Sequence, residues 1–309
     1  MNAPVIISVG SGKGGVGKSS LTANIGALLA GKGYRVGYVD ADLEGANLHL
    51  CLGVKRPALN LQDFIAGRVR RLADVAVQTV VPGAWLISGA SDILQLANPR
   101  FSQKQKIISN LVKLDADYLL VDLGAGTDNN VVDFFTSFPC GIVISDILPT
   151  SIENAYGFLK NAVVRALMRL FPGREDVHAQ IRLFSDSKSA GGFSAMEGFL
   201  AACRATFPHE AGVMREWLAS RRMFLVLNMV KHKDDVEAGR RFAEIVKKYL
   251  GLKLFYIGYL AYSDDIRRSL RNLTPAVLDD PSPVTRRCFE AITGNLEALT
   301  RGYAAHDHA

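Results

Sequence analysis

The sequence predicts an α/β protein built on a doubly wound, mostly parallel sheet. Short apolar runs rich in β-branched residues alternate with segments of helical spacing along the 309 residues. These runs are mostly unbroken rather than alternating with polar residues, as expected when helices cover both faces of a parallel sheet. No internal repeat or low-complexity linker divides the chain, so we interpret residues 1–309 as a single domain.

Seven apolar runs are the candidate strands, and four segments between them are the candidate helices. The strands are expected at Pro4–Val9, Arg35–Asp40, Trp85–Ser88, Tyr118–Asp122, Gly141–Ser145, Phe224–Leu227 and Leu254–Ile257. The helices are expected at Ser19–Gly31, Ser102–Leu114, Ile152–Leu170 and Val236–Tyr249. The repeated order of strand, helix and strand predicts crossover connections and therefore a parallel sheet.

The stretch at about 172–222 breaks this rhythm, because it is too long for an ordinary connection and contains several Pro and Gly residues. Within it, Ala195–Thr206 and Glu210–Ser220 have helical spacing. We interpret the stretch as a helical insertion on the rim of the sheet. It either packs over the core or provides a surface for a protein partner, and the sequence leaves both open.

Composition restricts the class of protein. Hydrophobic residues make up 49% of the chain and charged residues 21%, which is ordinary for a globular protein. No apolar run approaches the roughly 18–20 residues that a membrane span needs, and the first apolar run is too short for a signal peptide. We therefore expect a cytoplasmic protein.

The net charge is +6 and basic pairs recur along the chain. They are Arg70-Arg71, Arg221-Arg222, Arg240-Arg241, Lys247-Lys248, Arg267-Arg268 and Arg286-Arg287. Such pairs indicate either solvated helix faces or a surface for nucleic acid or anionic lipid, and charge alone does not decide between these. The four cysteines include no C-x-x-C pair, and the six histidines form no ligand cluster.

A glycine-rich segment directly after the first predicted strand carries the clearest chemistry. Its sequence, Gly-Lys-Gly-Gly-Val-Gly-Lys-Ser, is a P-loop in the required setting between a strand and a helix. Backbone N–H groups and the helix N-terminus would surround phosphate oxygens, Lys18 would pair with the β/γ oxygens, and the Ser19 hydroxyl would bind Mg²⁺. The candidate nucleotide-binding residues here are Gly12, Lys13, Gly14, Gly15, Val16, Gly17, Lys18, Ser19 and Ser20.

The second lysine of the loop, Lys13, is not needed to hold the phosphates of its own nucleotide. The segment Lys-Gly-Gly-Val-Gly-Lys-Ser resembles the deviant Walker A motif of the MinD/ParA family of P-loop ATPases. By that resemblance Lys13 crosses the interface of a face-to-face homodimer formed with ATP and contacts the partner's nucleotide. It would supply charge where a GTPase borrows an arginine finger.

Further segments extend the resemblance and assign more residues. Val-Asp-Ala-Asp resembles switch I, which implies that Asp40 helps to hold the Mg²⁺ shell and that Asp42 orients the attacking water. A helix N-cap is the alternative role for Asp42. Residues 119–126 resemble Walker B with switch II, which implies that Asp122 belongs to the second shell of Mg²⁺ and that Gly124 lets the backbone approach the γ-phosphate. Asn228 stands where the family places an asparagine that reads adenine.

The Gly-Ala-Gly form of switch II is closer to the FlhG/FleN branch, which regulates flagellar number, than to MinD. Two devices of these branches are not recognised in this sequence: an N-terminal extension that contacts partners and a C-terminal membrane-targeting helix. The last apolar stripe has helical spacing, and we expect it to pack on the domain rather than on a membrane. It consists of Val284, Cys288, Ile292, Leu296, Leu299 and Tyr303.

The resemblance therefore implies an ATP-dependent dimerisation switch of the MinD/FlhG type, with Lys13, Lys18 and Asp42 as its catalytic residues and ATP and Mg²⁺ as its cofactors. Hydrolysis is expected to be slow and stimulated by a protein partner, and the output to be positioning or counting of a cellular structure. Three alternatives stay open. They are a ParA-like ATPase that binds DNA non-specifically, a metabolic ligase or synthetase on the same fold, and a metal-cluster carrier, which the missing C-x-x-C disfavours.

Overall fold

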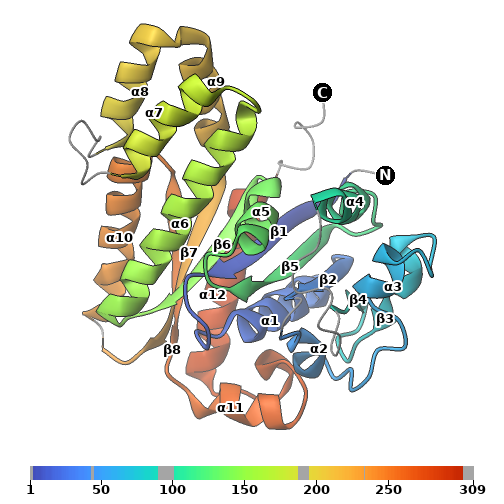
Figure 1. The fold of residues 1–309 in the computed structure, drawn as a ribbon. Helices are drawn as coiled ribbons and strands as arrows, with labels where there is room; N and C mark the ends of the chain where they lie inside the picture. Colours follow the sequence, from blue (N-terminus) through green and yellow to red (C-terminus); the bar gives the residue numbers. More distant parts are fainter. Residues whose placement is uncertain (1–2, 43–44, 90–100, 187–194, 233, 302–309) are drawn as a thin grey trace.

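The computed structural model describes residues 3–42, 45–89, 101–186, 195–232 and 234–301. Its centre is one eight-stranded sheet in the order β3-β4-β2-β5-β1-β6-β7-β8 (Figure 1). Neighbouring strands are parallel except β3 and β4. The predicted fold class is thus confirmed. The strands are β1 (Val5–Ser11), β2 (Val36–Ala41), β3 (Val77–Gln78), β4 (Ala84–Ile87), β5 (Tyr118–Ala125), β6 (Cys140–Asp146), β7 (Arg222–Val230) and β8 (Leu254–Ala261).

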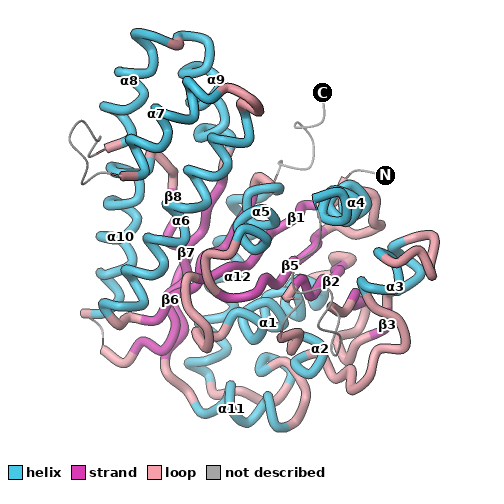
Figure 2. Tube along the Cα trace, viewed as in Figure 1, coloured by secondary structure: helices cyan, strands magenta, loops and turns pink. Residues whose placement is uncertain are grey.

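Helices cover both faces of the sheet (Figure 2). On one face, α1, α2 and α12 share a buried apolar cluster with the strands. On the other face, a second cluster joins α4, α5, α6 and α10 to the strands. The helices are α1 (Lys18–Gly31), α2 (Leu48–Cys51), α3 (Leu61–Ile65), α4 (Phe101–Leu111), α5 (Asn129–Ser137), α6 (Pro149–Leu170), α7 (Glu175–Ser185), α8 (Met196–Thr206), α9 (Pro208–Ser220), α10 (Asp235–Leu250), α11 (Asp264–Arg271) and α12 (Pro283–Thr300).

The register of the central strands places the acidic residues beside the P-loop. Strand β5 lies between β1 and β2, and Asp122 is paired with Val9 on one side and Asp40 on the other. The P-loop follows β1 directly, and the segment bearing Asp42 follows β2. The carboxyl ends of parallel strands meet at one edge, so these segments converge there.

The predicted insertion contains three helices among its described residues, α7, α8 and α9. The two predicted helices are present, and α9 begins two residues earlier than expected because Pro208 occupies its first position. Helix α7 was missed although Val177, Ile181 and Phe184 give it a buried stripe. These helices connect the end of α6 to the start of β7, so they lie at the amino ends of the strands, away from the P-loop.

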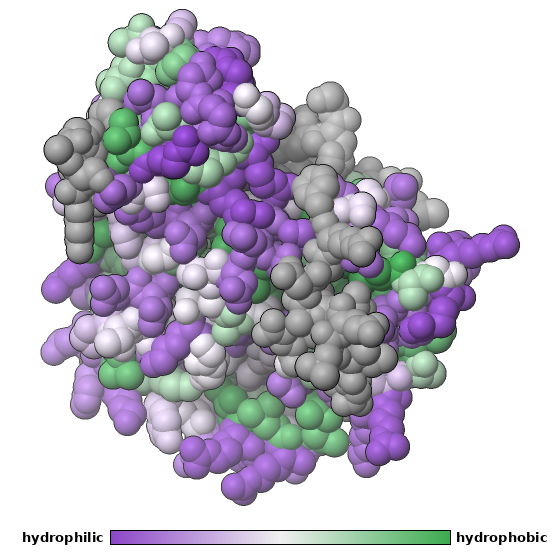
Figure 3. Space-filling view, viewed as in Figure 1, coloured by the Kyte–Doolittle hydropathy of each residue, from purple (hydrophilic) through white to green (hydrophobic). Residues whose placement is uncertain are grey.

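The C-terminal helix α12 packs on the sheet, as its apolar stripe predicted. Ile292 and Leu296 are fully buried, whereas Val284 at its start is 50% exposed; Tyr303 lies outside the described residues. In the part of the chain that the structure describes, no helix has both the length and the apolar composition needed to cross a membrane. Figure 3 shows a mainly hydrophilic face with a small apolar group near α11.

Candidate nucleotide site

The P-loop has backbone positions that only glycine suits. Gly15 and Gly17 adopt φ of 77° and 96°, in the left-handed region that side chains disfavour. At Gly12 a Cβ atom would lie 2.1 Å from the carbonyl oxygen of Asn154 in α6, so the loop and this helix are in direct contact. Helix α1 begins at Lys18 with Gly17 as its N-cap. The free N–H groups of its first turn therefore face the concave side of the loop.

Lys18 is the buried cation of the site, with 9% of its surface exposed. Burial lowers its pKa, and the nearby charges of Asp122 and Asp42 oppose that shift. Asp122 is 1% exposed and is hydrogen-bonded by the hydroxyls of Ser19 and, at 3.4 Å, Thr22. Burial raises the pKa of Asp122 in spite of these bonds. The P-loop lysine and hydroxyl thus lie beside the predicted Walker B carboxylate.

Asp40 anchors the segment that follows β2. Its side chain is fully buried and accepts hydrogen bonds from the backbone N–H groups of Asp42 and Leu48, both at 3.1 Å. Burial raises its pKa well above the ordinary range, and the neighbouring charge of Asp122 adds to the shift. Asp40 and Asp122 are thus adjacent buried carboxylates, and Lys18 offsets the charge of Asp122, so the site is short of positive charge.

Asp42 lies over switch II. Its Oδ1 accepts a hydrogen bond of 2.9 Å from the N–H of Gly45, and a Cβ atom at Gly124 would come within 3.3 Å of that oxygen. The N-cap of the next helix, α2, is Asn47, whereas Asp42 accepts its bond from the N–H three residues later, so its alternative role as a cap of the following segment stays open. Asp42 and Gly124 are close enough for the first to position a water and the second to leave room beside it.

Lys13 contacts helix α6. It is exposed, and its Nζ lies 3.4 Å from the Oγ of Ser151 in the first turn of α6. The Ser11 hydroxyl donates to its backbone carbonyl at 2.8 Å. The two lysines of one loop therefore occupy different environments. No sequence motif marks Ser151, because its approach to Lys13 depends on how α6 packs against the loop.

Asn228, the predicted adenine reader, contacts the P-loop. It is 5% exposed, and its Nδ2 donates to the Val16 carbonyl at 2.7 Å, while its Oδ1 accepts from the N–H of Met229 at 2.8 Å. A Cβ atom at Gly17 would lie 2.5 Å from that Nδ2. The amide therefore braces the loop from β7, and its role in reading a base stays a prediction.

The residues present fit a nucleotide with Mg²⁺. Among the described residues, no three or more His, Cys, Asp or Glu side chains gather into a metal site. Mg²⁺ commonly takes few protein ligands together with phosphate oxygens and water. The Ser19 hydroxyl on Asp122 suits that arrangement, with Asp40 behind it. Val16 and Ser20 are buried and anchor the loop, whereas Gly14 is exposed.

A parallel sheet with a P-loop after its first strand and a carboxylate on the neighbouring strand defines a P-loop NTPase. Residues 2–150 match the family model "ParA: NUBPL iron-transfer P-loop NTPase". The flagellum site-determining protein YlxH of Helicobacter pylori is 35% identical over 156 residues, 50% of this chain and 52% of that protein. The antiactivator FleN of Pseudomonas aeruginosa is 34% identical over 165 residues, 52% and 57% of the two chains. The chain thus spans about half the length of these curated relatives.

Solved structures extend the fold likeness to nearly the whole chain. MinD of Pyrococcus horikoshii, complexed with Mg-ADP, has a TM-score of 0.67 at 21% identity and covers 97% of this chain and 98% of its own. The cell division ATPase MinD of Pyrococcus furiosus has a TM-score of 0.66 at 20% identity, covering 97% and 100%. The match over residues 2–150 and the likeness in fold confirm the resemblance to ParA/MinD P-loop NTPases that the motifs predicted.

Proposed function

We propose that this chain is a cytoplasmic ATPase that acts as an ATP-dependent dimerisation switch. The observation that carries the proposal is the contrast between the two P-loop lysines. Lys18 is 9% exposed and lies among carboxylates, whereas Lys13 is exposed beside Ser151. One lysine is placed to neutralise the nucleotide of its own chain, and the other, held by a long hydrogen bond to Ser151, could reach a second copy.

In this proposal each residue has a separate task. Lys18 pairs with the β/γ oxygens, Ser19 binds Mg²⁺, and Asp40 and Asp122 hold the surrounding water. Bound Mg²⁺ would neutralise developing charge on the phosphates. Asp42 orients the attacking water. Since Lys13 enters only with the partner copy, hydrolysis requires the dimer.

The proposed output is placing or counting a cellular structure, and YlxH supports placement because it is named as site-determining for the flagellum. We propose slow hydrolysis stimulated by a protein partner, since a switch requires a long-lived ATP state. Helices α7–α9 are a candidate partner surface. They lie at the sheet end opposite the P-loop, so a protein bound there would not block a dimer formed across the nucleotides.

The other classes of function have less support, although the matching family model is described as an iron-transfer P-loop NTPase. The basic pairs lie on separate elements, and Arg221 and Arg222 donate to backbone carbonyls instead of forming an open basic surface. Cys51, Cys140 and Cys203 are buried, which disfavours a cluster carrier. DNA binding would appear as salt-sensitive association with random-sequence duplex in ATP. A ligase or synthetase would show turnover stimulated by a metabolite.

The test measures nucleotide binding, mass and turnover separately. Lys13→Ala should bind ATP as a monomer and lose both dimerisation and hydrolysis, because it removes charge that the partner's phosphates need. Asp42→Ala should bind ATP, dimerise and stall, because only the orientation of water is lost. Size-exclusion with light scattering in Mg-ATP distinguishes them. The control is Lys113→Ala, which removes an exposed lysine beyond α4. If Lys13→Ala dimerises and turns over ATP like this control, the switch proposal is wrong.

A further inference from the structure

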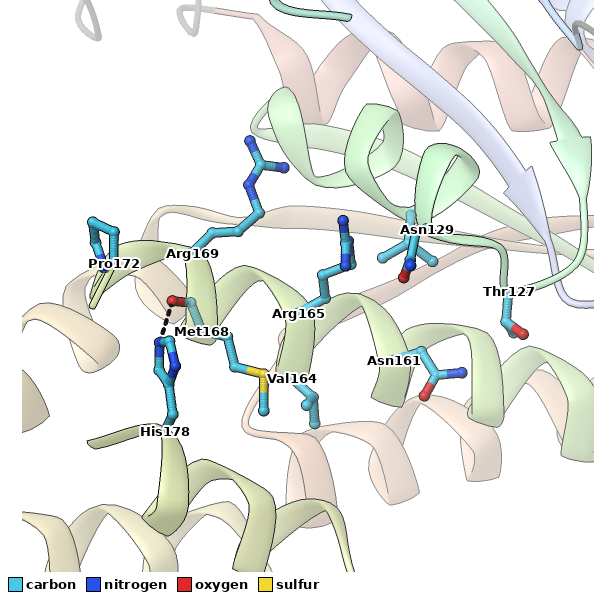
Figure 4. Close-up of a pocket in the computed structure, with 10 residues that line it drawn as sticks. Thr127, Asn129, Asn161, Val164, Arg165, Met168, Arg169, Pro172 and His178 are labelled. Carbon is cyan, nitrogen blue, oxygen red and sulfur yellow. Dashed lines mark hydrogen bonds between the residues drawn. The ribbon is translucent and has the colours of Figure 1, made fainter. Parts of the chain in front are cut away.

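A cavity of about 760 Å³ lies between α5, α6 and the start of α7, apart from the P-loop (Figure 4). Its volume is within the range of roughly 300–1,000 Å³ that is usual for small-molecule sites. No P-loop residue lines it. The lining residues are Thr127, Asn129, Val132, Asn161, Val164, Arg165, Met168, Arg169, Pro172 and His178.

Positive charge is in excess beside the cavity. Arg165 donates to Asp133 at 2.9 Å, Arg169 donates to it at 3.2 Å, and Lys104 reaches it from α4. One carboxylate thus faces three cations, and no Asp or Glu is among the lining residues. His178 is held by the Met168 carbonyl at 2.9 Å. Among the described residues, the Arg169 guanidinium donates to Asp133 through one nitrogen, so its other donors are available to a ligand.

A helix end adds to this charge. Helix α5 has nine residues and begins at Asn129, which lines the cavity together with Thr127. Its N-cap Asp128 makes no side-chain capping bond. Positive partial charge at a helix N-terminus attracts anions, and the carboxylate of Asp128 at this N-cap offsets part of it. In Figure 4 the two arginines extend from α6 toward α5, so both sources of charge meet in the same cavity.

Several other lining residues are apolar and could contact an apolar part of a ligand. Val132, Val164 and Met168 contribute side chains from α5 and α6, and Pro172 closes the end near α7. A single phosphate or carboxylate would leave most of this volume unfilled. The arrangement suits a ligand with an anionic head and an apolar body.

We propose that this cavity binds a small organic anion, with a carboxylate or phosphate head between Arg169, Arg165 and the start of α5. The ligand would contact both helices that flank the candidate nucleotide site, since α5 follows switch II and α6 carries Ser151. Regulation of turnover through these helices rests on the proposed function. Binding of the anion does not depend on the proposed function, so it is measured in the absence of nucleotide.

Isothermal titration with defined probes tests the site. Benzoate and phenyl phosphate carry the two heads on one ring, and benzyl alcohol carries the ring without charge. Phenyl phosphate is titrated into a Lys18→Ala background to remove P-loop binding. We expect at least one anion to bind about tenfold or more tightly than benzyl alcohol. The probe that binds more tightly shows whether the natural ligand carries a carboxylate or a phosphate.

Two variants locate the binding. Arg169→Gln removes a half-exposed cation, and Asn161→Trp fills the cavity without changing charge; each should weaken the anion about tenfold or more. The control Arg182→Gln removes an exposed arginine of α7 outside the lining and should bind normally. Circular dichroism checks the fold of each protein. The proposal is overturned if neither anion binds better than benzyl alcohol, or if both cavity variants bind like the control.

Discussion

Buried negative charge is compensated differently in two groups of residues in this chain. At the nucleotide end, Asp40 and Asp122 lie side by side, Lys18 is the buried cation next to Asp122, and burial raises the pKa of both carboxyls. Between α4, α5 and α6, burial also acts on Asp133, but hydrogen bonds from Arg165 and Lys104 outweigh it and lower its pKa. The carboxylates at the nucleotide end have too few cations beside them, whereas Asp133 has three.

The difference indicates what each group is for. A carboxylate that is fully paired inside the protein has no electrostatic need for a ligand, and its pairing fixes neighbouring helices. Carboxylates left with too little positive charge gain most from a cation, which is what Mg²⁺ would supply. We therefore expect substitutions at Asp133 to affect folding and substitutions at Asp122 to affect nucleotide binding.

The largest expected effect on stability is that of Asp133→Asn. It leaves the buried Lys104, whose side chain is 8% exposed, beside two arginines without their shared carboxylate. Removing one partner of a buried ion pair typically costs about 3–5 kcal/mol. Urea unfolding should show this loss. Asp74→Asn, which breaks an exposed pair with Arg71, is the control and should change stability far less, because solvent screens exposed ion pairs.

Asp122→Asn should lower the affinity for Mg-ATP and not the stability of the fold. The variant relieves unfavourable burial of charge, so in EDTA its stability should equal or exceed that of the unmodified protein. Its affinity for Mg-ATP should fall about tenfold or more, because the Ser19 hydroxyl and the Mg²⁺ shell lose their acceptor. Titration with and without Mg²⁺ measures this. Equal destabilisation by Asp122→Asn and Asp133→Asn would remove the distinction between the two groups.

The two groups should also respond to pH in opposite directions. The pKa of Asp122 is raised in the folded protein, so this carboxyl contributes stability below its ordinary pKa near 3.9 and the contribution is lost as pH rises. The stability of Asp122→Asn relative to the unmodified protein in EDTA should therefore increase from about pH 5 to pH 8. The lowered pKa of Asp133 stabilises the fold above that range, and the penalty of Asp133→Asn should shrink as pH falls below about 4. Thermal melts of each variant against the unmodified protein test both signs.

Sequence reasoning reached the nucleotide group but not the other one. The P-loop, Asp40 and Asp122 lie in short motifs next to strands, where local spacing determines the geometry. The ion pairs of Asp133 could not be predicted, because its cations come from two other helices and no sequence motif indicates that these helices pack together. Helix α5 itself was missed between two strands. Thr22 was also missed, although it lies one helical turn after Lys18 and its hydroxyl donates to the Lys18 carbonyl.

The smallest expected effect concerns Asn228, where the sequence predicts base reading and the structure shows a bond to the P-loop. Losing the hydrogen bond to the Val16 carbonyl should cost about 1 kcal/mol, or roughly fivefold in affinity, because the loop is less well ordered before phosphate binds. If Asn228 only braces the loop, Asn228→Ala should weaken ATP and GTP equally. If it also reads adenine, ATP should lose more and the preference for ATP over GTP should fall. Competition titrations of both nucleotides separate these outcomes, and unchanged affinity for both would contradict either role.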